Sequence, residues 1–149
     1  MSVAEKAERS QYRPIVLCVA SAVFMVRLDS YIVNISLPTI ARYFRVGTGE
    51  VSWVVLTYLL VMTSCMLLFG KLGDRLGLKR IFLLGYLVFT AASLFCGLSP
   101  TIHLLDAARG IQGIGGAMMV VSAFAVISRL LPEHLTGWAF GICSFANSL

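Results

Sequence analysis

Asp29 and Arg109 are residues of opposite charge inside apolar stretches of this 149-residue sequence, where each is expected to need a partner. Asp29 falls within an apolar stretch over residues 15–37, and Arg109 falls within another over residues 104–127. Charged side chains in a membrane-spanning helix are costly and face the bundle interior or a water-filled cavity. An aspartate held there can take up and release a proton, and a nearby arginine changes how readily it does so. The chemistry expected of this pair is therefore proton exchange.

Three interpretations of Asp29 remain open. Arg27 lies about 200° away round the helix, so Asp29 and Arg27 do not pair, and Asp29 shares its own face mainly with apolar residues. A cation from another helix, of which Arg109 is one candidate, would complete the site. Asp29 then carries the proton, or only pairs with a cation to fix helix packing, or contacts a cationic substrate directly. For Arg109, a local pair with Asp106, three residues earlier, is the alternative.

The elements that carry these residues are predicted from hydropathy. The chain is 58% hydrophobic and 13% charged, and its mean hydropathy is +0.88, as is typical of a membrane protein. A helix needs roughly 20 apolar residues to cross the hydrocarbon core. We predict an all-α polytopic membrane protein with helices at about 15–37, 51–69, 81–98 and 104–127. A truncated fifth helix over 138–149 is too short to span, so the chain resembles the front end of a longer one.

The positions of lysine and arginine predict the orientation. Residues 1–13 are expected to be a cytoplasmic N-terminal tail, and residues 14–149 a partial N-terminal transmembrane bundle. Cytoplasmic loops carry an excess of lysine and arginine. The side that holds the tail has eight such residues (Lys6, Arg9, Arg13, Lys71, Arg75, Lys79, Arg80 and Arg129), and the opposite side has two (Arg42 and Arg45). The N-terminus is therefore expected in the cytoplasm.

Several other classes of function are not favoured by the sequence. Each of the four cysteines lies alone in a different apolar stretch, so no metal site and no cofactor is expected. No hydrolase or acyltransferase motif is found, which argues against an enzyme. The net charge of +5 comes from short clusters between apolar stretches, so it indicates orientation in a bilayer and not nucleic-acid binding.

The stretch GKLGDRLGLKR, Gly70 to Arg80, joins the second and third apolar stretches. It resembles the loop signature of the major facilitator superfamily, G-x-L-A-D-R-x-G-R-K-R. The matching residues are Gly70, Leu72, Asp74, Arg75, Gly77, Lys79 and Arg80. The resemblance implies a latch at the cytoplasmic face, in which Asp74 meets a helix end beyond Leu149. An ordinary solvated basic loop is the alternative.

A second motif lies in LLDAARGIQGIGGAMM. Arg109, Gln112, Gly113 and Gly116 recur at i, i+3, i+4 and i+7 and so share one helical face. Small residues on that face let another backbone come close. The stretch resembles the helix 4 motif of the same family, built around R-x-x-Q-G. This resemblance implies a transport role for Arg109, and a structural ion pair is the alternative.

A third motif, LDSYIVNISLP, surrounds Asp29. It resembles the helix 1 signature L-D-x-T-x-V-N-x-A-L-P of the fourteen-helix drug:proton antiporter branch, with Leu28, Asp29, Asn34 and Pro38 among the matches. Residues 132–141 resemble a further family pattern, P-x-x-x-R-G-x-A-x-G, in which Thr136 stands where arginine is usual. The arginine of that pattern is therefore absent from this chain.

These resemblances imply the N-terminal part of a major facilitator fold, in which the first three helices form one unit and the fourth begins an inverted copy. They imply that the full-length parent exports drugs or toxic amphipathic compounds across the cytoplasmic (inner) membrane in exchange for protons. Its partners would be the lipid bilayer, a small-molecule substrate, protons and the missing C-terminal helices. Transport of a narrower metabolite, an inactive fragment and a non-transporting scaffold are the alternatives.

Overall fold

The computed structural model describes residues 3–148, and the described chain is all-α. Its five helices are α1 (Val3–Phe44), α2 (Thr48–Leu76), α3 (Leu78–Gly97), α4 (Ile102–Leu130) and α5 (Glu133–Ser148). Helices α1 to α4 are each long and apolar enough to cross a membrane. The predicted fold class, with four spanning helices and a shorter fifth, is confirmed for this part of the chain.

The helices extend beyond most of the predicted apolar stretches. Helix α1 continues through Pro38 to Phe44, and it includes the predicted tail from Val3 onward. Helix α5 begins at Glu133, five residues before the predicted start, whereas α3 ends at Gly97, one residue early. Apolar length measures the part of a helix that lies in hydrocarbon, whereas backbone hydrogen bonds continue into the polar ends. Residues 1, 2 and 149 of the predicted ranges lie outside the described residues.

Helix α4 is the centre of the bundle, and glycines let its neighbours approach closely. A Cβ atom added to Gly113 would lie 2.7 Å from the backbone oxygen of Tyr58 in α2. A Cβ atom added to Gly115 would lie 2.6 Å from the backbone nitrogen of Phe89 in α3, and one added to Gly85 would lie 2.7 Å from Cβ of Met118. Helices α2, α3 and α4 therefore pack backbone against backbone, and buried residues of α4 occur from Ile102 to Ile127.

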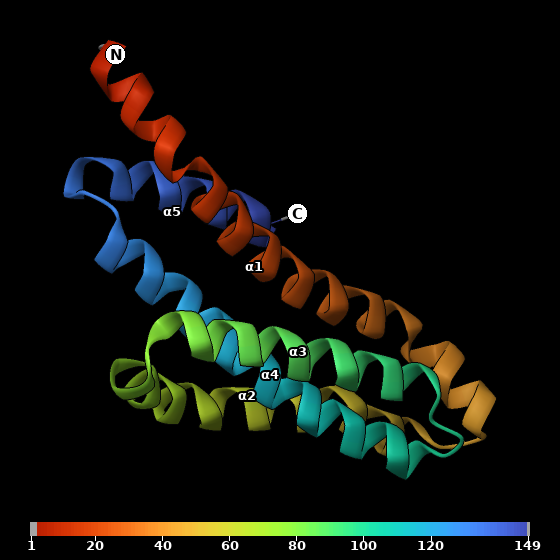
Figure 1. Cartoon of the computed structure of the whole chain (residues 1–149). Helices are drawn as coiled ribbons and strands as arrows, with labels where there is room; N and C mark the ends of the chain where they lie inside the picture. The colour runs from red at the N-terminus through yellow and green to blue at the C-terminus, as the bar shows by residue number, and fades with distance from the viewer. Residues whose placement is uncertain (1–2, 149) are drawn as a thin grey trace.

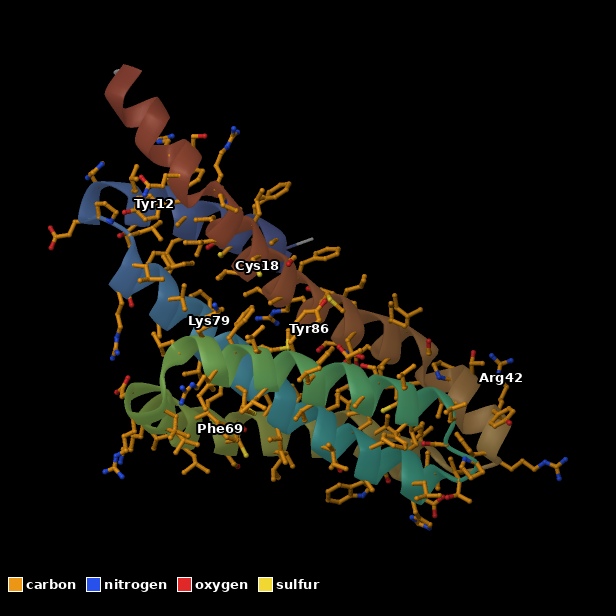
Figure 2. The ribbon with its side chains drawn as sticks, in the orientation of Figure 1. Tyr12, Cys18, Arg42, Phe69, Lys79 and Tyr86 are labelled. Carbon is orange, nitrogen blue, oxygen red and sulfur yellow. The ribbon has the colours of Figure 1, made fainter. Side chains whose placement is uncertain are left out.

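Helix α1 crosses this three-helix group obliquely, and α5 lies beside the first half of α1 (Figure 1). A buried cluster that includes Val16, Val23, Leu135 and Ala139 joins α1 to α5. Farther along α1, the hydroxyl of Tyr86 in α3 lies 3.4 Å from the sulfur of Met25, in the gap between the two helices (Figure 2). A smaller cluster at the far end joins α1 to α2 and α4.

The connections between consecutive helices lie at two opposite ends of the bundle (Figure 1). Lys79, near the α2–α3 junction, and Arg42, near the end of α1, lie at opposite ends (Figure 2). Apolar side chains between these ends are exposed, among them Ile35 at 80% and Leu67 at 74%. An apolar surface of this extent suits a helix bundle surrounded by lipid.

The segment from Gly70 to Arg80 is not a loop, which corrects the sequence prediction. Helix α2 continues to Leu76, and α3 begins at Leu78. Gly77 alone separates the two helices, with a φ angle of 95° that other residues rarely adopt. Because one glycine reverses the chain, the remaining residues of the motif can stay helical.

Candidate functional site

The predicted charged pair forms between α1 and α4. Atom Nη1 of Arg109 lies 2.6 Å from Oδ2 of Asp29, and the two side chains are 2% and 20% exposed. Each charge is therefore compensated by the other in a region from which water is largely excluded. The sequence named Arg109 as one candidate partner for Asp29, and the structure brings these two residues together.

Gln112 connects the ion pair to α3. Its Nε2 atom donates to Oδ1 of Asp29 over 2.8 Å and to Oγ of Ser93 over 2.7 Å. Its Oε1 atom accepts a hydrogen bond of 2.5 Å from Nη1 of Arg109. Both carboxylate oxygens of Asp29 thus accept hydrogen bonds from α4, one from a cation and one from a neutral amide.

Helix α2 fixes the orientation of the guanidinium. The Nε atom of Arg109 donates to the backbone oxygen of Val54 over 3.3 Å. The guanidinium carbon lies 4.1 Å from the ring centroid of Tyr58, a cation–π contact. We call Asp29, Tyr58, Ser93, Arg109 and Gln112 the Asp29–Arg109 cluster. It draws residues from four helices, so it reports on how these helices are arranged.

The glycines of the helix 4 motif make room for Tyr58. Gly113 faces the Tyr58 backbone, and a Cβ atom added to Gly116 would lie 3.2 Å from the Tyr58 hydroxyl. Arg109 and Gln112 are buried on the same side of α4. The four residues that were predicted to share a helical face therefore all contact, or lie directly beside, the Asp29–Arg109 cluster.

Other predicted site residues lie outside this cluster. The Nδ2 atom of Asn34 donates to the Ser30 backbone oxygen over 2.8 Å, while Leu28 and Pro38 are exposed on α1. The alternative pair of Asp106 with Arg109 is not formed, because Arg109 is held by Asp29 and by α2. Of the helix 1 motif, only Asp29 reaches the cluster.

Asp74, in the motif from Gly70 to Arg80, forms a second ion pair with Arg129 of α4. Atom Nη2 of Arg129 lies 2.6 Å from Oδ1 of Asp74. The side chains are 55% and 56% exposed. Asp74 therefore has a partner within this chain, which the sequence did not predict. The other charged residues of the motif are all exposed, and they are Lys71, Arg75, Lys79 and Arg80. Thr136, at the position where arginine is usual, donates to the Pro132 backbone oxygen over 3.0 Å.

Sequence reasoning missed Tyr58 and Ser93. A signal for both was present, because each is a hydroxyl-bearing residue within an otherwise apolar spanning stretch, where polar groups need partners. Tyrosine is enriched at the ends of spanning helices, whereas Tyr58 lies inside α2 and is 1% exposed.

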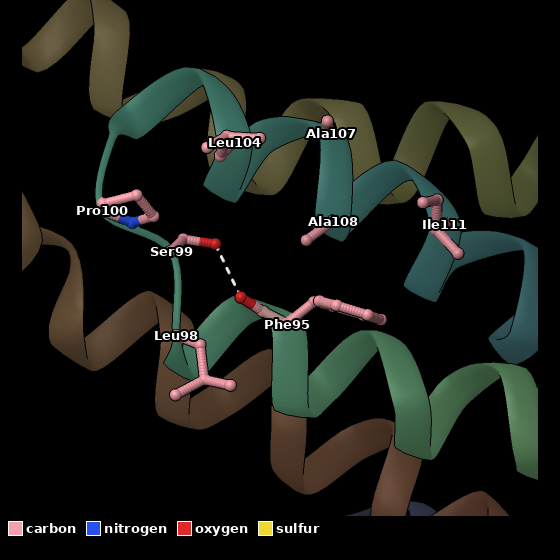
Figure 3. Close-up of a pocket in the computed structure, with 8 residues that line it drawn as sticks. All are labelled: Phe95, Leu98, Ser99, Pro100, Leu104, Ala107, Ala108 and Ile111. Carbon is pink, nitrogen blue, oxygen red and sulfur yellow. Dashed lines mark hydrogen bonds between the residues drawn. The ribbon is translucent and has the colours of Figure 1, made fainter.

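An apolar cavity of about 280 Å³ lies beside the α3–α4 turn (Figure 3). Its lining includes Phe95, Leu98, Leu104 and Ile111, and the Ser99 hydroxyl there donates to the Phe95 backbone oxygen over 2.7 Å. The described lining residues include no charged side chain. This cavity offers space to an apolar chain such as a lipid tail but no group for proton exchange.

Comparison with known proteins decides the family. Residues 19–149 match the sequence profile of the Major Facilitator Superfamily. The chain belongs to the major facilitator superfamily. Proteins of this superfamily are membrane transporters, so the chain is a multi-pass membrane protein of a transporter family.

Three curated relatives have names that refer to different compounds. The chain is 38% identical to the riboflavin transporter RibZ of Clostridioides difficile, over 86% of this chain and 28% of the relative. It is 43% identical to the multidrug resistance protein Stp of Mycobacterium tuberculosis, over 74% of this chain and 20% of the relative. It is 37% identical to the tetracenomycin C resistance and export protein of Streptomyces glaucescens, over 88% of this chain and 24% of the relative. The chain thus spans at most about 28% of each.

Proposed function

We propose that these residues form the N-terminal part of a complete transporter in the cytoplasmic membrane that exports drugs or toxic amphipathic compounds in exchange for protons. The observation that carries the proposal is the buried ion pair between Asp29 and Arg109. A buried pair is an uncertain source of stability, because desolvation of the two charges offsets their attraction. One proton can neutralise the Asp29 carboxylate, and the pair could therefore serve proton exchange and not stability.

The proposed step moves one proton and forms or breaks no other covalent bond. The Asp29 carboxylate takes a proton from the outer side, which removes its negative charge and weakens its contact with Arg109. The transporter then alternates by rocking one helical bundle against the other. On the inner side the proton leaves, the carboxylate is restored, and the ion pair reforms.

The neighbouring residues make this step depend on conformation. Arg109 contacts the carboxylate in the present arrangement, and movement of α1 away from α4 would break this contact. Gln112 also donates to Asp29 in the present arrangement, so the same movement would break a second hydrogen bond. Tyr58 and the Val54 carbonyl hold the guanidinium in place, so that displacement of α1 separates the pair.

Replacement of the carboxylate in the complete transporter tests the role of Asp29. Asp29→Asn keeps an oxygen that can accept from Arg109, so folding and expression are expected to be retained, while substrate-induced proton release from proteoliposomes is lost. Glu50→Gln, which removes an exposed carboxylate at the start of α2, is the matched control and is expected to release protons normally. Undiminished proton release by Asp29→Asn would refute the proposal, and loss of expression would favour a packing role for Asp29.

Transport of a narrower metabolite is the second candidate, and the similarity to a riboflavin transporter favours it. The two candidates differ in substrate range. Efflux of several chemically unrelated dyes from cells that express the complete transporter supports drug export. Transport confined to one compound and its close analogues supports the metabolite.

A further inference from the structure

A cavity of about 340 Å³ opens between α1, α2 and α4, next to the Asp29–Arg109 cluster. Its wall is continuous with the cluster, because Tyr58 belongs to both. The described lining has three hydroxyl-bearing side chains (Ser30, Tyr58 and Thr63) and one cation (Arg27). The rest of the lining is apolar and includes Met62, Met66, Val120 and Phe124. This composition suits a ligand that has both a polar and an apolar part.

The Tyr58 hydroxyl is a hydrogen-bond donor with no partner among the described residues. The side chain is 1% exposed and its Oη atom is buried without a hydrogen bond to a described residue, although the Ser30 side chain of α1 lies close to it. The Ser30 hydroxyl uses its own hydrogen within α1, where it donates to the Val26 backbone oxygen over 3.1 Å. A buried polar group without a partner is costly, and a ligand acceptor in the cavity would remove this cost.

The charge of the cavity wall is positive. Arg27 is the one charged side chain among the described lining residues. The carboxylate of the neighbouring cluster belongs to Asp29. Its two oxygens already accept hydrogen bonds from Arg109 and Gln112. A cationic ligand group would meet the like charge of Arg27, whereas an anionic group would find a cation and a phenol donor.

The apolar part of the wall can accept a bulky organic group. Met62 and Met66 follow Tyr58 at four-residue intervals on α2, and Phe124 faces the same cavity from α4. Methionine side chains are flexible and polarisable, and sulfur makes favourable contacts with aromatic rings. This wall therefore suits an aromatic or fused-ring body.

We propose that this cavity binds amphipathic organic anions, with a carboxylate or phenolate held by Arg27 and the Tyr58 hydroxyl and an aromatic body held by Met62, Met66 and Phe124. The proposal names the substrate class of the transporter proposed above and rests on that function. Arg27 is not part of the helix 1 signature, so anion preference would be a property of this chain and not of the motif.

A pair of dyes with the same ring skeleton and opposite charge tests the proposal. Fluorescein, at a pH at which it is anionic, and the cation rhodamine 123 are titrated with the complete transporter in nanodiscs of neutral phosphatidylcholine, and fluorescence polarisation reports binding. No proton gradient is present, so the measurement does not depend on coupling. Wild-type protein is expected to bind fluorescein at least about tenfold more tightly than rhodamine 123.

Variants assign this binding to the cavity. Arg27→Gln is expected to weaken fluorescein binding about tenfold or more, and Arg27→Lys to restore most of it. Tyr58→Phe keeps the ring beneath Arg109 and is expected to weaken binding several-fold. Arg42→Gln, which removes an exposed arginine at the far end of α1, is the matched control and is expected to bind as wild type.

Each outcome bears on the proposal. Equal binding by wild type and Arg27→Gln, tighter binding of rhodamine 123, or an equal loss in Arg42→Gln would overturn it. Fluorescein binding that depends on Arg27, in a protein whose efflux does not use protons, would support the anion site while refuting the proposed proton coupling. The two proposals can therefore fail separately.

Discussion

Arg109 and Asp29 are 80 residues apart in sequence, and their side chains meet at 2.6 Å. This contact ties α1 to α4 at a point where glycines hold α2 and α3 close against α4. The pair is thus a polar connection between an oblique helix and a tightly packed group of three. The predictions below concern this connection, the packing that supports it and the orientation of the bundle.

Replacement of Arg109 by lysine is expected to lower transport at least about tenfold. Lysine keeps the positive charge but loses the planar fork that reaches Val54, Asp29 and Gln112 together, and it stacks less well on Tyr58. Arg129→Lys is the control, because its exposed ion pair is expected to contribute about 0–1 kcal/mol. Substrate efflux and thermal unfolding of both variants provide the measurement, and equal behaviour of the two would contradict the assigned role of Arg109.

Addition of one methyl group at Gly113 is expected to destabilise the bundle. In Gly113→Ala the new Cβ atom would lie 2.7 Å from the Tyr58 backbone oxygen, so α2 must shift, at a cost of about 1–3 kcal/mol. Gly141→Ala in α5 has open space around the new atom and is expected to be neutral or stabilising. Thermal unfolding in detergent compares the two variants. An unchanged melting temperature for Gly113→Ala would show that a methyl group fits between α4 and the Tyr58 backbone of α2.

The Asp74–Arg129 pair is expected to be unimportant for stability, although Asp74 is expected to be required for transport. Both side chains are more than half exposed, so breaking the pair costs about 1 kcal/mol or less. The double variant Asp74→Arg with Arg129→Asp exchanges the two charges of the pair. If Asp74 acts as a latch toward the other half of the transporter, this double variant is expected not to transport. Recovery of transport in this double variant would instead assign the function of Asp74 to its pair with Arg129.

The α2–α3 junction is expected to face the cytoplasm, because most lysine and arginine residues lie at that end. In a background without the native cysteines, Leu76→Cys is expected to resist a membrane-impermeant thiol reagent applied to intact cells. Gly47→Cys, in the α1–α2 connection, is the control and is expected to react from outside. Reaction of Leu76→Cys from outside would reverse the proposed orientation.

The 149-residue chain alone is expected not to transport. Alternating access moves one helical bundle against another, and the chain spans 28% or less of the three relatives described above. Helix α5, with 16 residues, reaches about 24 Å, which is less than the hydrocarbon thickness. Proteoliposomes that contain only this chain are compared with those that contain the complete transporter. Substrate efflux by the short chain would prove this prediction wrong.

Hydropathy alone was sufficient to predict the fold class and the four spanning helices, because a bilayer imposes a length and a composition on each of them. It was less informative about helix ends. The polar extension of α1 before Ile15 and the helical course of residues 70–76 depend on backbone hydrogen bonds that apolar length does not measure.

The site was only partly predictable for a related reason. Helical periodicity placed Arg109, Gln112, Gly113 and Gly116 on one face, since that depends on one helix only. Which residues this face meets depends on how neighbouring helices cross and rotate. The contacts of Arg109 with Tyr58 and of Gln112 with Ser93 therefore appear only in the structure.

The close contact at Gly113 also limits how protons can leak across the bundle. Since even a methyl group does not fit between α4 and the Tyr58 backbone, no file of water molecules fits there either. The contact of Gly115 with Phe89 closes the α3–α4 side in the same way. Asp29 retains 20% exposure of its side chain. A path for protons to this carboxylate therefore does not run through the α2–α4 or α3–α4 seam, because the backbones there are too close for water.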